Sequence, residues 1–395
     1  MFSSPMQLLS RLCFIWAVFG CGFLYSSTML AETLPADGAV LVYFGTYTGA
    51  KSKGIYVSRF DPATGRLTAP ELAAATASPS FLALDPSRRF LYAAGETSFL
   101  EGKRVGAVSA FSVNAKTGRL TFLNRQSSGG EGPCHVAVDQ TGKCLLVANY
   151  GDGSIAALPI QADGALAEPG TVIQHKGSSV NPTRQAGPHA HSMTIDAANR
   201  FVLACDLGLD QVLVYRFDAA KATLVANDPP FVAVKPGLGP RHLAFHPSGR
   251  VVFLISEMGS ALTAFSYDAK RGTLKEVQTI STLPKEFAGN SAGAEVQVHP
   301  SGKFVYGSNR GHDSIAVFGF DANRGQLTSL QSQPTQGKIP RHFALDPTGQ
   351  WLLAENQGSD SVVVFRVDAK TGQLSPTEQR ISVGSPVCAV FVPAK

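Results

Sequence analysis

The sequence has little charge and no cluster of basic residues. Only 16% of the 395 residues are charged, and 34 Lys and Arg face 29 Asp and Glu, which leaves a thinly spread net charge of +5. No Lys/Arg run or arginine-rich arm is present that would follow a phosphate backbone, so we expect no nucleic-acid partner. Because 44% of the residues are hydrophobic, the chain can bury a large core.

Several sequence signatures are also missing. There is no long helical periodicity, no dinucleotide-binding fingerprint and no phosphate-binding loop. Only two tryptophans occur, Trp16 and Trp351, so the regular Gly-His and Trp-Asp pairs of WD40 repeats are absent. No Ser-His-Asp arrangement is visible, which disfavours a covalent acyl-enzyme.

A long apolar run occurs only near the N-terminus. Arg11 precedes "LCFIWAVFGCGFLY", which is too short for a convincing membrane span and is followed by small and polar residues up to Ala31. This pattern predicts a secretory signal peptide over residues 1–31, a short segment over 32–38, and an exported protein, periplasmic or secreted, without stable membrane insertion after cleavage. Lipoprotein anchoring at Cys21 is a lesser alternative because Phe19 is bulky where a small residue is usual, and an uncleaved anchor is another.

Four of the six cysteines lie beyond the predicted signal peptide: Cys134, Cys144, Cys205 and Cys388. Cys134 and Cys144 are symmetric about Asp139, so a disulfide across a hairpin is one interpretation. Two buried free thiols are the alternative, which we favour. Cys205 and Cys388 lie in apolar strand patterns and are expected in the core.

One short pattern recurs seven times, about fifty residues apart. It reads "FDPATGRL" at its first occurrence and starts at residues 60, 113, 160, 217, 267, 320 and 367. Each copy has a polar turn, usually with glycine, between apolar alternating runs, which is typical of β-hairpins.

A second pattern, "PSFLALDPSRRFLYAAG" at its first occurrence, reads as strand, tight turn, strand and starts at residues 79, 133, 188, 240, 294 and 340. A seventh copy begins at Pro386 and stops at the C-terminus, while "AVLVYFGTY" from Ala39 supplies its missing second strand. We therefore predict an all-β fold: one seven-bladed β-propeller over residues 39–395, with four-stranded antiparallel blades and a closing blade shared between the two termini.

Polar residues gather where strand one begins and strand two ends, because these points share one face of a propeller. Aligned on the residue that closes strand one, the polar positions are His191, Arg241 and Arg341; then His135, Ser192, His242, Glu295 and His342; and, at the end of strand two, Glu96, Tyr150, Glu257 and Arg310 with Asn149 and Asn309 before them. The same strands are otherwise apolar, so the core does not require these groups. We expect them to form a site at one mouth of the channel.

The two histidines in "AGPHAHSMTID" differ in their position within the blade alignment. His189 lies in a two-residue insertion, whereas His191 takes the position that is arginine in two other blades. We favour His191 for chemistry and His189 as its support. His246 and His299 occupy turn positions held elsewhere by Asp and are expected to be structural.

Two alternatives compete with a catalytic site. Each rim residue can equally serve in an ion pair between blades or bond a neighbouring carbonyl. A His-x-His metal site is the other alternative, but Arg241, Arg310 and Arg341 disfavour a divalent cation and favour an anion such as a carboxylate or phosphate. We expect no metal.

The motifs "GPHAHSMTID", "GPRHLAFHPSGR", "SEMGS" and "AEVQVHPSGKFVYGSNRGHDSIAVF" resemble the seven-bladed lactonase family that includes bacterial 6-phosphogluconolactonase and fungal carboxy-cis,cis-muconate cyclase. The resemblance covers the chain from Ala39 onward. It implies ring opening or closing of a lactone without a required metal, at a site of His191, Arg241, Glu257 and Arg310, with His189 as an alternative for the histidine. We also expect no cofactor.

These residues suit lactone hydrolysis, in which water attacks the carbonyl carbon and an oxyanion forms. We assign His191 as general base, Arg241 and Arg310 to the oxyanion and any acidic group of the substrate, and Glu257 to orienting an arginine or moving a proton. The substrate-binding candidates are His189, His135, Asn149, His242, Asn309, Arg341 and His342.

Export separates this chain from a cytoplasmic 6-phosphogluconolactone, so unphosphorylated sugar lactones or other organic-acid lactones become the expected substrates. A lactone-forming cyclase and a non-catalytic propeller that binds a glycan or peptide stay open. The expected partner is a small-molecule lactone or anionic sugar acid, and the expected state is a monomer.

Overall fold

The computed structural model describes residues 40–97, 99–100 and 102–392, all within the unit Thr33–Lys395. The predicted signal peptide (1–31) and short segment (32–38) lie outside the described residues. Their boundaries, including cleavage near Ala31 and the alternative at Cys21, stay predictions. No helix of the described residues is long and apolar enough to cross a membrane.

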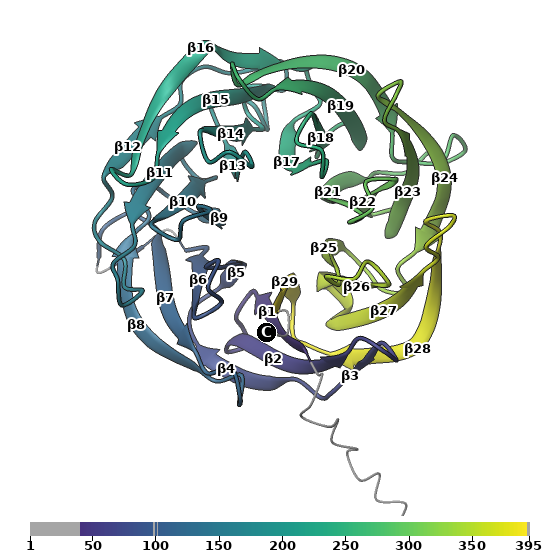
Figure 1. Ribbon diagram of the computed structural model, residues 1–395, viewed down its shortest axis with the longest axis horizontal. Coiled ribbons are helices and arrows are strands. Elements are labelled where there is room, and N and C mark those ends of the chain that lie inside the picture. The colour runs from purple at the N-terminus through teal and green to yellow at the C-terminus, as the bar shows by residue number, and fades with distance from the viewer. Residues whose placement is uncertain (1–39, 98, 101, 393–395) are drawn as a thin grey trace, which may run out of the picture. The chain divides into compact units, whose positions relative to one another are not determined.

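The described residues form seven antiparallel sheets arranged as blades around a central axis (Figure 1). Six blades are β5 (Pro79–Leu84), β6 (Phe90–Gly95), β7 (Ala107–Val113) and β8 (Leu120–Ser127); β9 (Pro133–Val138), β10 (Cys144–Asn149), β11 (Ser154–Pro159) and β12 (Thr171–Gln174); β13 (Ala190–Ile195), β14 (Phe201–Asp206), β15 (Gln211–Asp218) and β16 (Thr223–Ala233); β17 (Pro240–Phe245), β18 (Val251–Ser256), β19 (Ala261–Asp268) and β20 (Thr273–Ser281); β21 (Ala292–Val298), β22 (Phe304–Arg310), β23 (Ser314–Asp321) and β24 (Gln326–Pro334); β25 (Pro340–Leu345), β26 (Trp351–Asn356), β27 (Ser361–Val367) and β28 (Leu374–Ser382). The predicted fold class is confirmed.

The seventh blade closes the ring as predicted. Its order is β29 (Pro386–Val392), β1 (Val40–Thr46), β2 (Gly54–Asp61) and β3 (Arg66–Leu67), and β4 (Glu71–Ala75) also pairs with β2. Strands β1 and β29 pair antiparallel from Leu41↔Val392 to Thr46↔Pro386. The C-terminal strand is therefore the innermost strand of a blade whose other strands come from the N-terminal part of the propeller.

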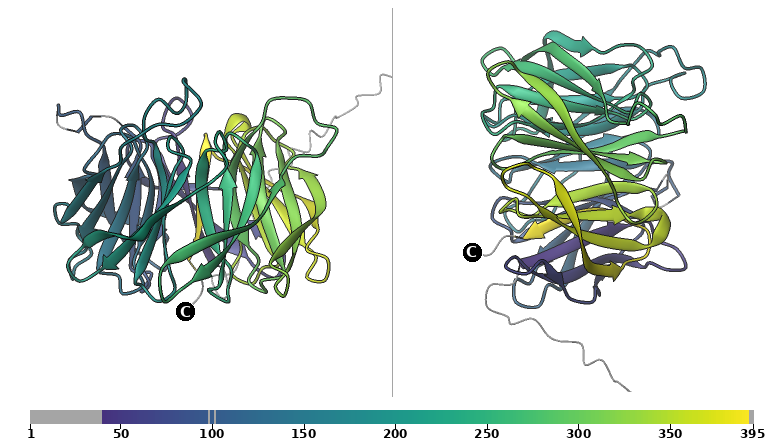
Figure 2. Two further views of the ribbon diagram at one scale, coloured as in Figure 1. Left: turned by 90° about the horizontal axis from the view of Figure 1, so that it is seen from above. Right: turned by 90° about the vertical axis from the view of Figure 1, so that its right-hand side faces the viewer.

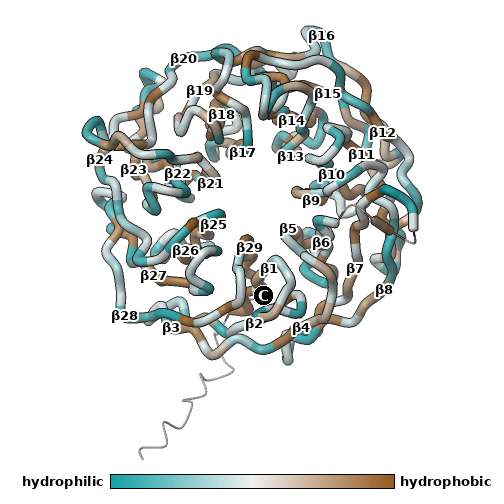
Figure 3. The backbone as a smooth tube through the Cα atoms, turned by 180° about the vertical axis from the view of Figure 1, so that it is seen from behind, coloured by the Kyte–Doolittle hydropathy of each residue, from teal (hydrophilic) through white to brown (hydrophobic). Residues whose placement is uncertain are grey.

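The core lies between blades. One buried cluster, for example, joins Leu146 and Ile155 of β10 and β11 to Met193 and Val202 of β13 and β14. Side views show neighbouring blades stacked face to face around the ring (Figure 2), and hydrophilic residues gather on outer strands such as β28 and on the turns (Figure 3). Burial between sheets thus positions every inner strand relative to its neighbours.

Buried tyrosines tie each of three blades to the next. The hydroxyls of Tyr43, Tyr92 and Tyr306 donate to the carbonyls of Gly118, Gly164 and Gly372, at 2.8, 3.0 and 2.8 Å, and all three tyrosines are fully buried. A buried tyrosine requires such a partner for its O–H, so these bonds fix the register between neighbouring blades.

The turns that close strand one are held by the Asp or His side chain at the closing position. Asp139 Oδ1 accepts the amide hydrogens of Lys143 and Cys144, at 2.6 and 2.8 Å, so the carboxylate organises the turn. Where histidine replaces aspartate, His246 Nε2 bonds Gly302 O and His299 Nε2 bonds Gly349 O, each at 3.0 Å on the next blade. The structural role expected for both histidines is confirmed.

The disulfide interpretation of Cys134 and Cys144 is wrong. Both thiols are free and buried, as are those of Cys205 and Cys388. The hairpin pairs Val138 with Leu145 and places Cys144 beside Asp139 at its turn, whereas Cys134 lies at the far end of β9. The sequence symmetry about Asp139 does not coincide with the centre of the turn, so the two sulfurs do not face each other.

Candidate active site

A β-bulge near the start of every inner strand shapes the channel mouth. In β17 the pairing shifts between Pro240 and His242, and equivalent shifts occur in β5, β9, β13, β21, β25 and β29. A bulge places two residues against one on the partner strand and re-aims their side chains. As a result, Arg241 and His242 both contribute to the polar cluster although they are adjacent in sequence.

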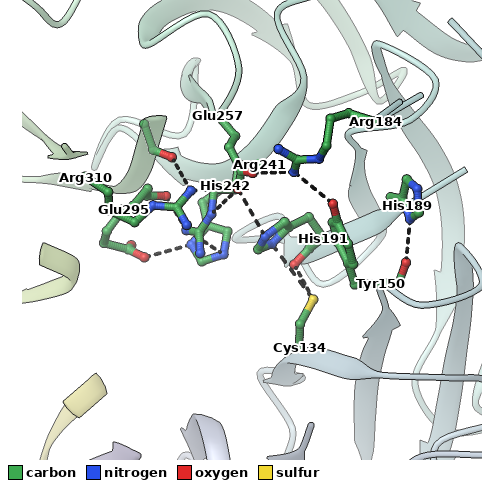
Figure 4. A network of polar contacts seen from close by, with 12 residues as sticks. Cys134, Tyr150, Arg184, His189, His191, Arg241, His242, Glu257, Glu295 and Arg310 are labelled. Carbon is green, nitrogen blue, oxygen red and sulfur yellow. Dashed lines mark hydrogen bonds and ion pairs between the residues drawn. The ribbon is translucent and has the colours of Figure 1, made fainter. Parts of the chain in front are cut away.

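The carboxylate of Glu257, just after β18, is the centre of this cluster (Figure 4). Its Oε2 lies 2.8 Å from Arg310 Nη2 and 3.2 Å from Arg241 Nε, and its Oε1 accepts a hydrogen bond from Arg184 Nη2 at 2.6 Å. Burial alone raises the pKa of this carboxyl, but the surrounding arginines outweigh burial and hold the pKa well below its usual range. Glu257 is therefore a carboxylate throughout the physiological pH range.

The two inner arginines are largely buried. Arg241 is 2% exposed, and its Nη1 donates to the carbonyl of Ala294. Burial, followed by the charges of Arg310 and Arg341, lowers the pKa of Arg241 to about 10, so it stays cationic at neutral pH. Burial also lowers the pKa of Arg310, whose Nε has no hydrogen-bond partner among the described residues. Buried cations with unused N–H groups favour an anionic ligand.

His191 lies beside Glu257 without a short hydrogen bond to it. Its Nε2 is 3.8 Å from Glu257 Oε2, and its Nδ1 is 3.9 Å from Cys134 Sγ. Burial, followed by the charge of Arg241, lowers the pKa of His191 well below 6.5. The imidazole is thus neutral at neutral pH and keeps a nitrogen that can accept a proton.

Deeper in the channel, two histidines and two carboxyls form a chain. His242 Nδ1 lies 2.7 Å from Glu295 Oε2, His342 Nε2 lies 3.7 Å from the same oxygen, and His342 Nδ1 lies 2.8 Å from Glu355 Oε2. Burial lowers the pKa of both histidines and raises that of both carboxyls, most strongly at Glu355. Burial therefore favours the protonated form of Glu355, whose O–H can donate to His342.

Arg341 lies on the other side of the mouth, apart from the arginines that contact Glu257. The guanidinium of Arg341 is 5.4 Å from the ring centre of Tyr47, whose hydroxyl donates to Glu96 Oε2 at 2.8 Å. Arg341 also lines a polar cavity with Cys134, Arg241 and His342. The volume open to the centre of a water molecule is about 10 Å³, room for about one water.

His135 faces the same interior. Its ring lies 4.3 Å from that of Phe81 and 5.3 Å from that of His242. Burial, followed by the charge of Arg241, lowers the pKa of His135 to about 3, so this imidazole is neutral as well. Neutral histidines thus surround cationic arginines without adding charge.

Comparison with known proteins decides the family. Residues 41–391 match the family described as "Lactonase, 7-bladed beta-propeller". The chain belongs to this family. It is 36% identical over 304 residues to a protein of Bacillus subtilis (strain 168) named 6-phosphogluconolactonase, which covers 77% of this chain and 84% of that protein.

Two solved structures support the assignment to the lactonase family. The Pseudomonas aeruginosa periplasmic gluconolactonase matches with a TM-score of 0.85 and 35% identity over 90% of this chain and 99% of that one. A putative 6-phosphogluconolactonase from Bacteroides fragilis NCTC 9343 matches with a TM-score of 0.84 and 35% identity over 91% and 100%. The resemblance found in the sequence is confirmed at the level of family and fold.

In this lactonase-family protein, most predicted site residues meet. His191, Arg241, Glu257 and Arg310 form one contact network, and His135, His242, Arg341 and His342 surround the adjoining interior. His189 lies beside this network: it stacks on Tyr150 at 4.6 Å, and its Nδ1 lies 2.8 Å from Tyr150 O. The catalytic and binding roles themselves stay predictions.

Asn149 and Asn309 are not brought to the channel. Both are fully buried. Asn149 Nδ2 donates to Ser128 O and Ser154 Oγ, and Asn309 Nδ2 donates to Thr282 O and Ser314 Oγ. Their amides hold connections between strands, so the geometry gives no support to the prediction that they bind substrate.

Sequence reasoning missed Arg184. This residue lies in the connection between β12 and β13, outside both repeat patterns, so no blade alignment points to it. The nearby Gly-Pro pair at 187–188 marks a turn but does not indicate that Arg184 reaches the site. Among the described residues, no group of three or more His, Cys, Asp or Glu side chains is placed to hold a metal ion.

Proposed function

We propose that this protein hydrolyses the lactone of a sugar acid or a related organic acid at the mouth of its channel. The observation that carries the proposal is a neutral, buried His191 whose Nε2 lies 3.8 Å from Glu257 Oε2, among arginines that the same carboxylate holds in place. Membership of the lactonase family and relatives named 6-phosphogluconolactonase and gluconolactonase support it.

In the first step, His191 removes a proton from water as its oxygen bonds to the lactone carbonyl carbon. The carbonyl electron pair moves onto oxygen, and Arg241 and Arg310 stabilise this oxyanion. Arg241 Nη2 and Arg310 Nη1 have no hydrogen-bond partner among the described residues, so N–H groups of these two terminal nitrogens remain for the oxyanion.

In the second step, the oxyanion collapses and the ring C–O bond breaks. The departing alkoxide takes the proton from the His191 imidazolium, which restores the neutral base and releases a hydroxy acid. Glu257 stays ionised and orients Arg241 and Arg310, since its depressed pKa makes it a poor proton carrier at neutral pH.

We also propose export, in line with the N-terminal apolar segment and the structural relative titled a periplasmic gluconolactonase. An exported enzyme meets unphosphorylated sugar lactones and other organic-acid lactones more readily than a cytoplasmic phosphate ester. Cell fractionation of the full chain, and of a chain lacking residues 1–31, checks this location.

The experiment for the activity is acid release from glucono-lactone in weak buffer, with spontaneous opening subtracted. We expect the wild type to exceed the spontaneous rate and His191→Ala to lose at least about 100-fold in kcat, in line with general-base catalysis. Full activity in the His191→Ala variant would contradict the assignment of His191 as the base. If the wild type does not accelerate the reaction, the proposed hydrolysis of this lactone is contradicted.

A further inference from the structure

The connection that carries Arg184 is a long, firmly held segment above the site. It spans residues 175–189, whereas the equivalent connections after β16 and β24 span only 234–239 and 335–339. Buried His175 anchors its start: Nδ1 lies 2.7 Å from Asp206 Oδ2 and Nε2 lies 2.9 Å from the Tyr215 hydroxyl.

The residue after Arg184 is a second anchor. Gln185 is fully buried, and its Nε2 donates to Leu207 O and Asp210 Oδ2, at 2.9 and 2.8 Å. The end of the segment is fixed as well, because His189 N donates to Asp206 Oδ1 at 2.8 Å. Arg184 is therefore presented by a prearranged backbone, which reduces the entropy that binding would cost.

The guanidinium of Arg184 is only partly used. Its Nη2 donates to Glu257 Oε1 at 2.6 Å and to the Tyr150 hydroxyl at 3.0 Å, while Nε and Nη1 have no partner among the described residues (Figure 4). The side chain is 44% exposed, compared with 3% for Arg241 and 15% for Arg310. Arg184 is thus the most solvent-accessible of the three arginines that contact Glu257.

The charge around Glu257 is not balanced by its own contacts. One carboxylate faces Arg184, Arg241 and Arg310, and the neighbouring histidine His191 is neutral. The inner cavity has room for about one water. A sugar lactone is too large for this cavity, so the part of it remote from Arg241 has to lie towards solvent, and Arg184 is the solvent-exposed arginine of the cluster.

We propose that Arg184 is a specificity-determining residue that binds an acidic group, a carboxylate or a phosphate, on the part of the lactone remote from the reacting carbonyl. The proposal rests on the lactonase function proposed above. Guanidinium groups bind both oxyanions through charge-assisted hydrogen bonds, and an exposed, prearranged arginine does so with little rearrangement. Arg184 would not increase the affinity for substrates that carry a neutral substituent at that place.

The test compares three lactones that differ at carbon 6: glucono-lactone with a hydroxymethyl group, its 6-phosphate, and glucarolactone with a carboxylate. We expect Arg184→Gln to lower kcat/KM about 10- to 100-fold more for at least one acidic lactone than for glucono-lactone, mainly through KM. The phosphate and carboxylate arms identify which acid is recognised. Arg184→Lys, which keeps the charge, is expected to fall between wild type and Arg184→Gln.

A matched control is Arg216→Gln, the same substitution at an exposed arginine of β15, which should leave all three lactones unaffected. Equal losses on all three lactones with Arg184→Gln would show a merely structural role and overturn the proposal, and so would no loss on any of them. If the wild type opens none of the lactones, the proposed function fails separately. In that case, calorimetry with gluconate, gluconate 6-phosphate and glucarate tests the role of Arg184 in binding. We expect Arg184→Gln to weaken binding of at least one of the two diacids, and unchanged binding would overturn the proposal.

Discussion

Arg310 Nη2 lies 2.8 Å from Glu257 Oε2, and the two side chains are 15% and 8% exposed. The pair is thus a largely buried ion pair between β22 and the residue that follows β18, in neighbouring blades. Removing one partner of such a pair is costly because the other charge stays buried without compensation. Glu257 therefore contributes both to the stability of the mouth and to the placement of its arginines.

Glu257→Gln is expected to lower Tm by several degrees and kcat by about 100-fold, because Arg241 and Arg310 lose their counter-charge and their orientation. Differential scanning calorimetry and lactone hydrolysis measure the two effects. Glu131→Gln is the control, since Glu131 pairs with the exposed Arg104 and such a pair contributes about 1 kcal/mol or less. Unchanged Tm and unchanged kcat in Glu257→Gln would contradict the central role of this carboxylate.

The pH dependence of activity should report His191. Its pKa lies well below 6.5 because burial and the charge of Arg241 disfavour the imidazolium, and only the neutral form can act as base. We expect kcat/KM to be constant above about pH 6.5 and to fall only at more acidic pH. Initial rates from pH 4 to 8, corrected for spontaneous opening, test this, and an acid limb centred above pH 7 would contradict it.

Glu355 should make the protein less stable as pH rises. Burial raises its pKa well above 4.5, so the folded state keeps a proton that the unfolded chain releases. Stability from this group is fully present below pH 4.5 and is lost as pH rises towards the pKa of the folded state. The Tm of Glu355→Gln relative to wild type should therefore increase from pH 5 to pH 8, and a difference that is independent of pH would rule this out.

Closure of the ring depends on β29. Deleting residues 386–395 removes the inner strand of the closing blade, including the fully buried Cys388, and leaves β1 with an unpaired edge. We expect this chain to aggregate or to lose its cooperative unfolding transition. A deletion of residues 393–395 alone retains β29 and serves as the control; a longer deletion that unfolds like the wild type would argue against closure by this strand.

The blades could be predicted from the sequence because turn chemistry and strand alternation repeat at a constant period. The alignment on Asp139 and its equivalents also placed His191 level with Arg241, which the register of β13 and β17 confirms. The contacts of Asn149 and Asn309 could not be predicted in the same way, because proximity to the mouth does not fix which side of a strand a residue faces. The bulges that aim Arg241 and His242 together have no residue signature of their own.

Arg184 could not be predicted for a different reason. Its position depends on buried partners such as Asp206 and Asp210, which lie on or just after β14 and far from it in the sequence. Loops outside a repeat are placed by tertiary contacts, and a single sequence does not display these.

The most direct test of the central claim is the rate of glucono-lactone opening by the wild type and by Arg241→Ala, with the lactone 6-phosphate measured in parallel and spontaneous hydrolysis subtracted. Arg241 is buried, contacts Glu257 and is assigned to the oxyanion. We predict that the wild type opens at least one of the two lactones well above the spontaneous rate and that Arg241→Ala loses at least about 100-fold in kcat. An Arg241→Ala variant that is folded and as active as the wild type would contradict catalysis at this mouth.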